Sequence, residues 1–289
     1  MKFGIVFANT GPFCDPAAAV DLAVADEAAG FESLWTVEHT VVPYGYESEY
    51  PYDKSGRMPG EDDAPIPDPL IWLTYLASAT SIIRLGTGIL IQPQRNPVVL
   101  AKEVATLDHL SGGRVELGVG VGWLKEEFDA IGVPFEERGR RTDDGIAAMR
   151  ALWGEDRASY AGEFTTFTDC ISRPHPVAGS VPVHIGGHSE VAARRAGRLG
   201  DGFFPAKGSH RRLGELAGIV RSTATDAGRD PSAIEFTCGG NGVFGPGALE
   251  EAGALAELGV DRIVVPAFLF YRDTADALAR YGDEVIARV

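Results

Sequence analysis

The sequence predicts an α/β fold, a (β/α)8 TIM barrel, and three observations lead to that prediction. Eight short apolar runs alternate with helical segments along the whole chain. Most of these runs are continuously apolar, as in parallel strands that are buried on both faces. The length of 289 residues and the hydrophobic content of 45% suit such a barrel, which typically needs about 250 residues. Because no linker-like stretch divides the chain, we predict a single domain over residues 1–289.

The first half of the chain supplies four strands separated by helices with readable boundaries. The predicted strands are residues 3–8, 33–37, 84–91 and 114–121. Asp15 and Asp68 each precede a proline, which is the pattern of a capping residue followed by the first helical turn. An amphipathic helix that begins near Asn96 turns at Ser111 and two glycines directly into the fourth strand. A helix that leads into a buried strand is typical of a parallel sheet.

The second half repeats this alternation after an interruption. The predicted strands are residues 181–185, 202–204, 234–238 and 262–266, and the helices that follow them are 190–199, 211–227, 248–258 and 274–288. Before them we expect a short helix at 125–128, a longer helix at 142–153, and a solvated basic patch at 138–141 between the two. Glycines and prolines mark residues 154–180 as an excursion between strands four and five.

An extended loop after strand two, residues 40–68, has no periodicity and is rich in Pro, Gly, Tyr and acidic residues. A loop of this length inside a compact domain is typically a functional lid or a disordered insert. Four tyrosines, at positions 44, 46, 50 and 52, are suited to covering an apolar substrate. We therefore favour a lid over a plain surface loop and place Tyr44 in the substrate pocket.

Charge and cysteine content exclude several classes of function. The formal net charge of −15 and pI near 4.8 give a surface that repels phosphate backbones and anionic lipids, so we expect neither nucleic acid nor membrane as a partner. Cys14, Cys170 and Cys238 match no disulfide framework or zinc-ligand spacing. We therefore expect that the protein binds no metal and is located in the reducing cytoplasm. The start of the chain resembles a first strand, not a signal peptide, and no apolar run has the length of a membrane span.

Active sites of such barrels lie at the C-terminal ends of the strands, so the residues after each apolar run are the candidates. Strand four ends with Gly118, Gly120 and Gly122, followed by Trp123. Glycines at alternate strand positions cost stability unless another group approaches the backbone closely. We favour a flat or anionic ligand as that group; the alternative is tight packing of protein against protein.

Two further strand ends carry residues suited to chemistry. Glu38 and His39 follow strand two and combine a carboxylate with the side chain best matched to proton transfer near neutral pH, although a lone loop histidine is more often structural. Gly186, Gly187, His188 and Ser189 lead from strand five straight into a helix. Free amide groups at a helix N-terminus bind anions, most naturally phosphate; an ordinary capped helix after a glycine turn is the alternative.

Three segments together resemble the luciferase-like monooxygenase superfamily. They are Glu38-His39 at the end of strand two, RLGTGILIQPQRNPVVLAKEVATLDHLSGGRVELGVGVGW, and VPVHIGGHSEVAARRAGRLGDGFFP. Within it the chain is most similar to oxidoreductases that use the deazaflavin coenzyme F420. The resemblance covers nearly the whole chain and is weakest over residues 40–67 and after residue 206.

The resemblance implies a barrel that holds a tricyclic ring at its C-terminal rim. Gly88 and Ile89 match a bulge that often has a non-prolyl cis peptide against the ring, and residues 186–189 match the phosphate-binding loop. His39 matches a histidine beside the ring that assists hydride or proton transfer. Glu38 stands where relatives often carry Asp. Trp123 stands where the sugar-phosphate dehydrogenases carry a glutamate, which implies a different substrate, with Trp123 as an aromatic wall of the substrate pocket.

These expectations define three hypotheses. The first is hydride transfer between F420 and a small organic substrate. The second is a two-component FMN-dependent monooxygenase acting on an alkanesulfonate or aldehyde with a separate cofactor reductase. The third is a non-catalytic barrel that only binds a flavin or a partner. No residue distinguishes F420 from FMN, whereas His39 and the glycine-rich rim argue against the third. The resemblance also implies a homodimer.

Overall fold

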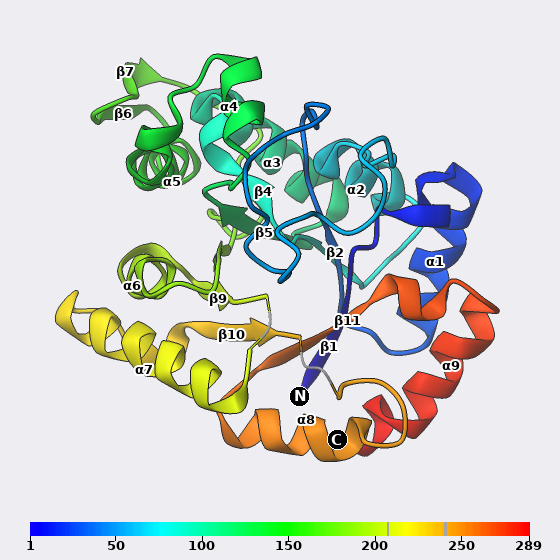
Figure 1. Cartoon of the computed structure of the whole chain (residues 1–289). Coiled ribbons are helices and arrows are strands. Elements are labelled where there is room, and N and C mark those ends of the chain that lie inside the picture. Colours follow the sequence, from blue (N-terminus) through cyan, green and yellow to red (C-terminus); the bar gives the residue numbers. More distant parts are fainter. Residues whose placement is uncertain (207, 240–241) are drawn as a thin grey trace.

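A computed structural model describes residues 1–206, 208–239 and 242–289. Within these residues, eight parallel strands close into a barrel, because β1 pairs with both β2 and β11 and β3 pairs with β5 (Figure 1). The barrel strands are β1 (Lys2–Val6), β2 (Ser33–Thr36), β3 (Arg84–Thr87), β5 (Val115–Gly120), β8 (Val183–Gly186), β9 (Gly202–Phe204), β10 (Glu235–Cys238) and β11 (Arg262–Pro266). The predicted (β/α)8 fold is confirmed.

Helices surround this barrel in the order that the sequence predicts (Figure 1). They are α1 (Pro16–Ala28), α2 (Pro69–Ala77), α3 (Pro97–Ser111), α5 (Arg138–Gly154), α6 (Glu190–Leu199), α7 (His210–Asp226), α8 (Ala248–Glu257) and α9 (Thr274–Glu284), and the short α4 (Lys125–Ile131) lies near the rim. Asp15, Asp68 and Asn96 each accept hydrogen bonds from two backbone N–H groups of the helix that they precede. The capping residues therefore set the helix starts, as predicted for Asp15 and Asp68.

Strand three is not continuous over residues 84–91. It divides into β3 and the two-residue β4 (Leu90–Ile91), with Gly88 and Ile89 between them. The Gly88–Ile89 peptide bond is cis, which agrees with the implication of the family resemblance. The main chain then continues in β4, which pairs with the end of β5.

Two expectations about the region before β8 need correction. Residues 138–141 are not a patch between helices but the first turn of α5, where Arg141 pairs with Glu137 and Arg138 lies over the Phe135 ring, 3.8 Å from its centroid. Residues 154–180 contain an antiparallel hairpin, β6 (Ala158–Ala161) and β7 (Thr166–Cys170), beside α5 (Figure 1). Both strands are short and largely exposed, so they have no apolar run from which the sequence could predict them.

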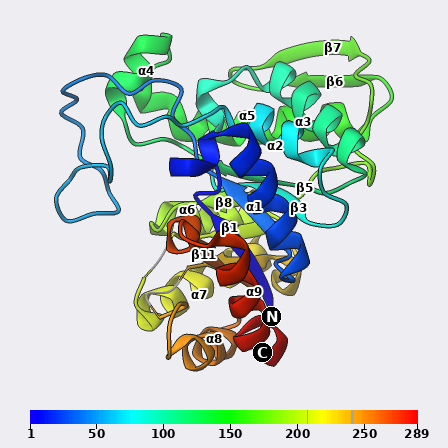
Figure 2. The same ribbon diagram turned by 90° about the vertical axis from the view of Figure 1, so that its right-hand side faces the viewer.

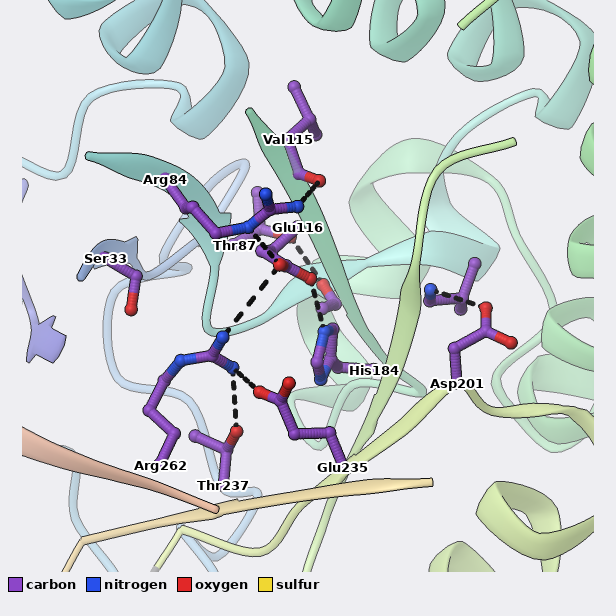
Figure 3. Close-up of polar contacts among 12 residues, drawn as sticks. Ser33, Arg84, Thr87, Val115, Glu116, His184, Asp201, Glu235, Thr237 and Arg262 are labelled. Atoms are coloured by element: carbon purple, nitrogen blue, oxygen red, sulfur yellow. Dashed lines mark hydrogen bonds and ion pairs between the residues drawn. The ribbon is translucent and has the colours of Figure 1, made fainter. Parts of the chain in front are cut away.

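The lower half of the barrel interior is filled by charged side chains from the N-terminal parts of the strands (Figure 3). Arg262 is fully buried and contacts Glu235, Glu116 and Thr237 inside the barrel and Glu32 at its edge. His184 Nε2 lies 2.6 Å from Glu116 Oε2. Above them, an apolar layer of Val6, Trp35, Phe204 and Val264 separates this network from the rim. The barrel is a packed core, and a ligand site is restricted to its upper end.

No helix in the described part of the chain is long and apolar enough to cross a membrane.

Candidate active site at the C-terminal rim

His39, which follows β2, contacts a carboxylate that sequence reasoning did not select. Its Nδ1 lies 3.1 Å from Oε2 of Glu127 in α4. The Glu127 side chain is 0% exposed, and its Oε1 accepts hydrogen bonds from the backbone N–H groups of Thr40 and Val41. Glu127 is part of an acidic pair in a short helix, a pattern typical of a solvated face. Only its position, four residues after Trp123 and close to a strand end, could have marked Glu127 as a candidate in the sequence.

Glu38 does not face His39, contrary to the expectation that the two residues act as a pair. Adjacent residues in an extended segment point to opposite sides. The buried Glu38 carboxylate accepts a hydrogen bond from the Ile91 backbone N–H and pairs with Arg95, which also contacts Asp68. Burial raises the pKa of Glu38, and the charge and hydrogen bonds of Arg95 and the Ile91 N–H oppose that rise. Glu38 therefore ties the end of β2 to the end of β4.

Trp123 is surrounded by aromatic rings from the rim and from the loop. Its ring centroid lies 5.6 Å from that of His39, 5.5 Å from Tyr46 and 5.2 Å from Tyr50, each in an edge-on arrangement. Burial raises the pKa of Tyr50 to about 12, so this hydroxyl stays neutral at physiological pH. Tyr44, which we expected in the pocket, is 97% exposed and points to solvent. The aromatic wall consists of Tyr46 and Tyr50, with Trp123.

Residues 40–68 contain no helix or strand and lie beside α4, projecting beyond the barrel (Figure 2). Glu126 of α4 accepts hydrogen bonds from the backbone N–H groups of Glu47 and Ser48, at 2.7 and 3.1 Å, and from the Ser48 hydroxyl at 2.7 Å. The Tyr52 ring lies 4.8 Å from that of His188, across the rim. Loop residues thus contact both Trp123 and the turn after β8 at the C-terminal rim.

The glycines of β5 and β8 make room for protein, which corrects our interpretation of them. A Cβ atom on Gly118 would lie 1.9 Å from the Thr87 carbonyl oxygen, and one on Gly120 or Gly186 would lie within 2.5 Å of the Ile89 side chain. Gly122 has a φ of +80° and lies against Phe128 and Ile91. The alternative of tight packing is therefore correct for these glycines. It is the half-buried Ile89 that is presented at the rim, packed on the apolar layer below.

The turn of Gly186, Gly187, His188 and Ser189 joins β8 to α6 as predicted. Gly187 has a φ of +119°, and its N–H donates to the Phe204 carbonyl oxygen at 3.2 Å, so this amide is not free. Ser189 caps α6 by accepting from the Ala192 N–H. The first-turn amides of a helix otherwise have no intrahelical partner. His188 Nδ1 is buried, and no described residue hydrogen-bonds to it; burial, then the charge of Arg212, lowers the pKa of His188. Binding of an anion at this turn therefore stays a prediction.

Within the described residues, no group of three or more His, Cys, Asp or Glu side chains is arranged to hold a metal ion. The rim instead combines the pair of His39 and the buried Glu127 carboxylate with an aromatic wall, the half-buried Ile89, and the His188 turn at a helix N-terminus.

Comparison with known proteins agrees with this architecture. An uncharacterised protein of Mycobacterium tuberculosis is 37% identical over 186 residues, which cover 64% of this chain and 65% of that protein. The F420-dependent glucose-6-phosphate dehydrogenase of Segniliparus rotundus is 33% identical over 228 residues, or 76% of this chain and 63% of the relative. The solved coenzyme F420-dependent tetrahydromethanopterin reductase of Methanopyrus kandleri superposes with a TM-score of 0.77 at 19% identity, covering 99% of this chain and 98% of that one. The sequence profile of luciferase-like monooxygenases matches residues 1–285. The chain belongs to the luciferase-like monooxygenase family.

Proposed function

We propose that this protein is an oxidoreductase that transfers a hydride between coenzyme F420 and a small organic substrate bound at the barrel rim. The observation that carries the proposal is that one loop contacts both Trp123, which lies beside His39, and His188 in the turn after β8, at a single end of the barrel. The 33% identity to an F420-dependent dehydrogenase supports the choice of cofactor. Because that match spans 63% of the relative, its substrate is not carried over.

The residues at the rim fit a cofactor that has a flat ring and a phosphate group. The first turn of α6 offers amide groups, and the acidic side chain in that turn, Glu190, is engaged by Arg194 at 2.9 Å. The buried Nδ1 of His188 is a polar atom without a partner among the described residues. We assign the phosphate to the Gly186–Ser189 turn and the ring to the apolar surface formed by Ile89 and Gly88.

When bound, F420 supplies the hydride donor or acceptor, the carbon at position 5 of its ring. The protein contributes orientation, exclusion of water and control of a proton. His39 is the group placed to hold or accept that proton, because its Nδ1 is occupied by Glu127 and its Nε2 is the remaining basic atom. Trp123, Tyr46 and Tyr50 form an apolar wall, which favours a substrate less polar than a sugar phosphate.

A homodimer is also part of this proposal. Ile71 and Tyr75 of α2 and Val99 of α3 are exposed apolar side chains on neighbouring helices. A second copy of the chain would cover them. Light scattering on the purified protein should give twice the monomer mass; a monomeric mass at micromolar concentration contradicts this part.

A binding experiment tests the cofactor. The purified protein is titrated anaerobically with F420 and, in parallel, with FMN, and binding is followed by the absorbance and fluorescence of each cofactor. We expect saturable binding of F420 and weaker binding of FMN. Tight uptake of FMN without binding of F420 contradicts the proposal and favours the two-component monooxygenase, which requires a reductase and consumes oxygen.

A further inference from the structure

We propose that Glu127 is a positioning residue that holds His39 in its Nδ1–H tautomer and joins the ring to the first residues of the 40–68 loop. The proposal deepens the function given above and rests on it for the catalytic role of His39. The tautomer of His39 is a property of the protein alone, so this part of the proposal does not depend on the proposed function.

The two oxygens of the Glu127 carboxylate have separate partners. Oε2 faces His39 Nδ1 at 3.1 Å, whereas Oε1 accepts from the Thr40 N–H and, at 3.3 Å, from the Val41 N–H. The side chain is fully removed from solvent, so these contacts do not compete with bulk water. A carboxylate only accepts hydrogen bonds, and therefore the His39 nitrogen that faces it must carry the proton.

This constraint decides what His39 offers to the rim. With the proton on Nδ1, the neutral ring presents the lone pair of Nε2, and no described residue hydrogen-bonds to that atom. The ring is held edge-on to Trp123, with an interplanar angle of 86°. His39 can then accept a proton at Nε2, while the Glu127 carboxylate stabilises the charged ring that results. The other neutral tautomer, protonated at Nε2, would present an N–H group to the rim where the lone pair would otherwise be.

The same carboxylate also fixes the entry of the loop. Thr40 and Val41 are the first loop residues, and Thr40 Oγ1 is additionally 3.1 Å from Gln94 Oε1. Ring orientation and loop entry therefore share one buried acceptor. Glu126, one position earlier, accepts hydrogen bonds from the Glu47 and Ser48 N–H groups and from the Ser48 hydroxyl. Within the described residues it has no hydrogen bond to His39, Thr40 or Val41, and it is therefore a natural control.

Glu127→Gln separates the two roles. The amide oxygen of Gln can still accept from Thr40 and Val41, but its NH₂ group donates toward His39 Nδ1. We therefore expect the ring to switch to the Nε2–H tautomer while the loop entry is kept. Long-range ¹H–¹⁵N spectra of the full-length protein, labelled at histidine and free of cofactor, report the tautomer directly. The His39→Gln variant identifies the His39 signals among those of the six histidines.

The expected spectra show Nδ1–H in the unmodified protein and in Glu126→Gln, and Nε2–H in Glu127→Gln. An Nε2–H ring in the unmodified protein overturns the proposal, and that measurement stands even if the variant fails to fold. A ring that remains Nδ1–H in a folded Glu127→Gln protein overturns it as well.

Kinetics supply the second readout. With F420 and a substrate, Glu127→Gln should lower kcat roughly tenfold or more, with little change in KM or in F420 affinity. If the tautomer switches but no F420-linked turnover exists, the positioning role stands and the proposed function fails. If turnover exists and the Glu127→Gln protein keeps both its tautomer and its kcat, the positioning role fails alone.

Discussion

At the scale of single residues, His39 is the side chain on which the proposed chemistry depends. Replacing it with Ala removes the basic nitrogen but leaves Ile89 and the Gly186–Ser189 turn intact. We expect kcat to fall by about 10²–10⁴, the usual contribution of a general acid or base. Affinity for F420, measured by fluorescence titration, should stay within about threefold of the original. Unchanged turnover would remove His39 from the mechanism.

The glycines of β5 lead to a second prediction at this scale. Gly118→Ala brings a Cβ against a backbone carbonyl, that of Thr87, which cannot move without distorting β3. Gly120→Ala meets the Ile89 side chain, which can change rotamer. In urea unfolding we expect losses of about 3 kcal/mol for Gly118→Ala and about 1–2 kcal/mol for Gly120→Ala.

Ile89→Ala provides the control for this pair. Added to Gly120→Ala it should recover part of the lost stability relative to the sum of the two single changes, whereas added to Gly118→Ala it should not. Equal losses at the two glycines would contradict the assignment of the contacts.

Sequence reasoning located rim residues but not their partners. His39, Trp123 and residues 186–189 were found because strand ends can be predicted from apolar runs. The partner of His39 lies 88 positions away in the chain, in a helix too short to show a periodic pattern. Adjacent Glu38 was therefore a natural but wrong choice, and the orientation of successive side chains, not their proximity in sequence, decides the pair.

At the scale of elements, α6 offers a test of anion binding. Ser189 caps this helix, and both Asp and Asn are equally good capping residues. Ser189→Asp keeps the cap but adds a negative charge where we place the cofactor phosphate, and Ser189→Asn keeps it without the charge. We expect roughly tenfold weaker F420 binding for the Asp variant and little change for the Asn variant.

Fluorescence titration at low and high ionic strength checks this expectation. The difference between the two variants should shrink at high salt, because screening weakens the repulsion. Equal affinity for both variants at low salt would place the phosphate elsewhere.

Helices were predicted better than strands at this scale because their ends carry chemical signals. Asp15 and Asp68 cap their helices as the sequence indicates. The division of residues 84–91 into β3 and β4 could not be read from the apolar run, which continues across Gly88 and Ile89; only the family resemblance implied a bulge there. The β6–β7 hairpin was missed for the opposite reason, because its largely exposed strands have no apolar face to detect.

At the scale of the whole molecule, charged side chains hold the lower barrel together. Glu116 contacts His184, Arg84 and Arg262 from three other strands (Figure 3). The fold class could be predicted from the alternation of strands and helices, but this network could not. Glu116 lies in an otherwise apolar strand, and its partners come from distant parts of the chain. Breaking a buried ion pair by removing one partner costs about 3–5 kcal/mol, since the others are left unpaired.

The network makes stability depend on acid in a defined range. Burial opposes ionisation of Glu116, but the His184 hydrogen bond and the charges of His184, Arg84 and Arg262 hold its pKa at about 2, below the ordinary 4.5. Because the pKa of Glu116 is lower in the folded protein, its ionised carboxylate adds about 3 kcal/mol to the free energy of unfolding. This contribution is fully present above pH 4.5 and is lost as the pH falls toward 2. Urea unfolding of the original protein and of Glu116→Gln at intervals from pH 7 to pH 2 measures it. We expect the variant to be less stable at pH 7 and the two unfolding free energies to converge below pH 4.5. Parallel curves over that range would mean that Glu116 does not carry its charge through this network, since only the ionised carboxylate distinguishes the two proteins.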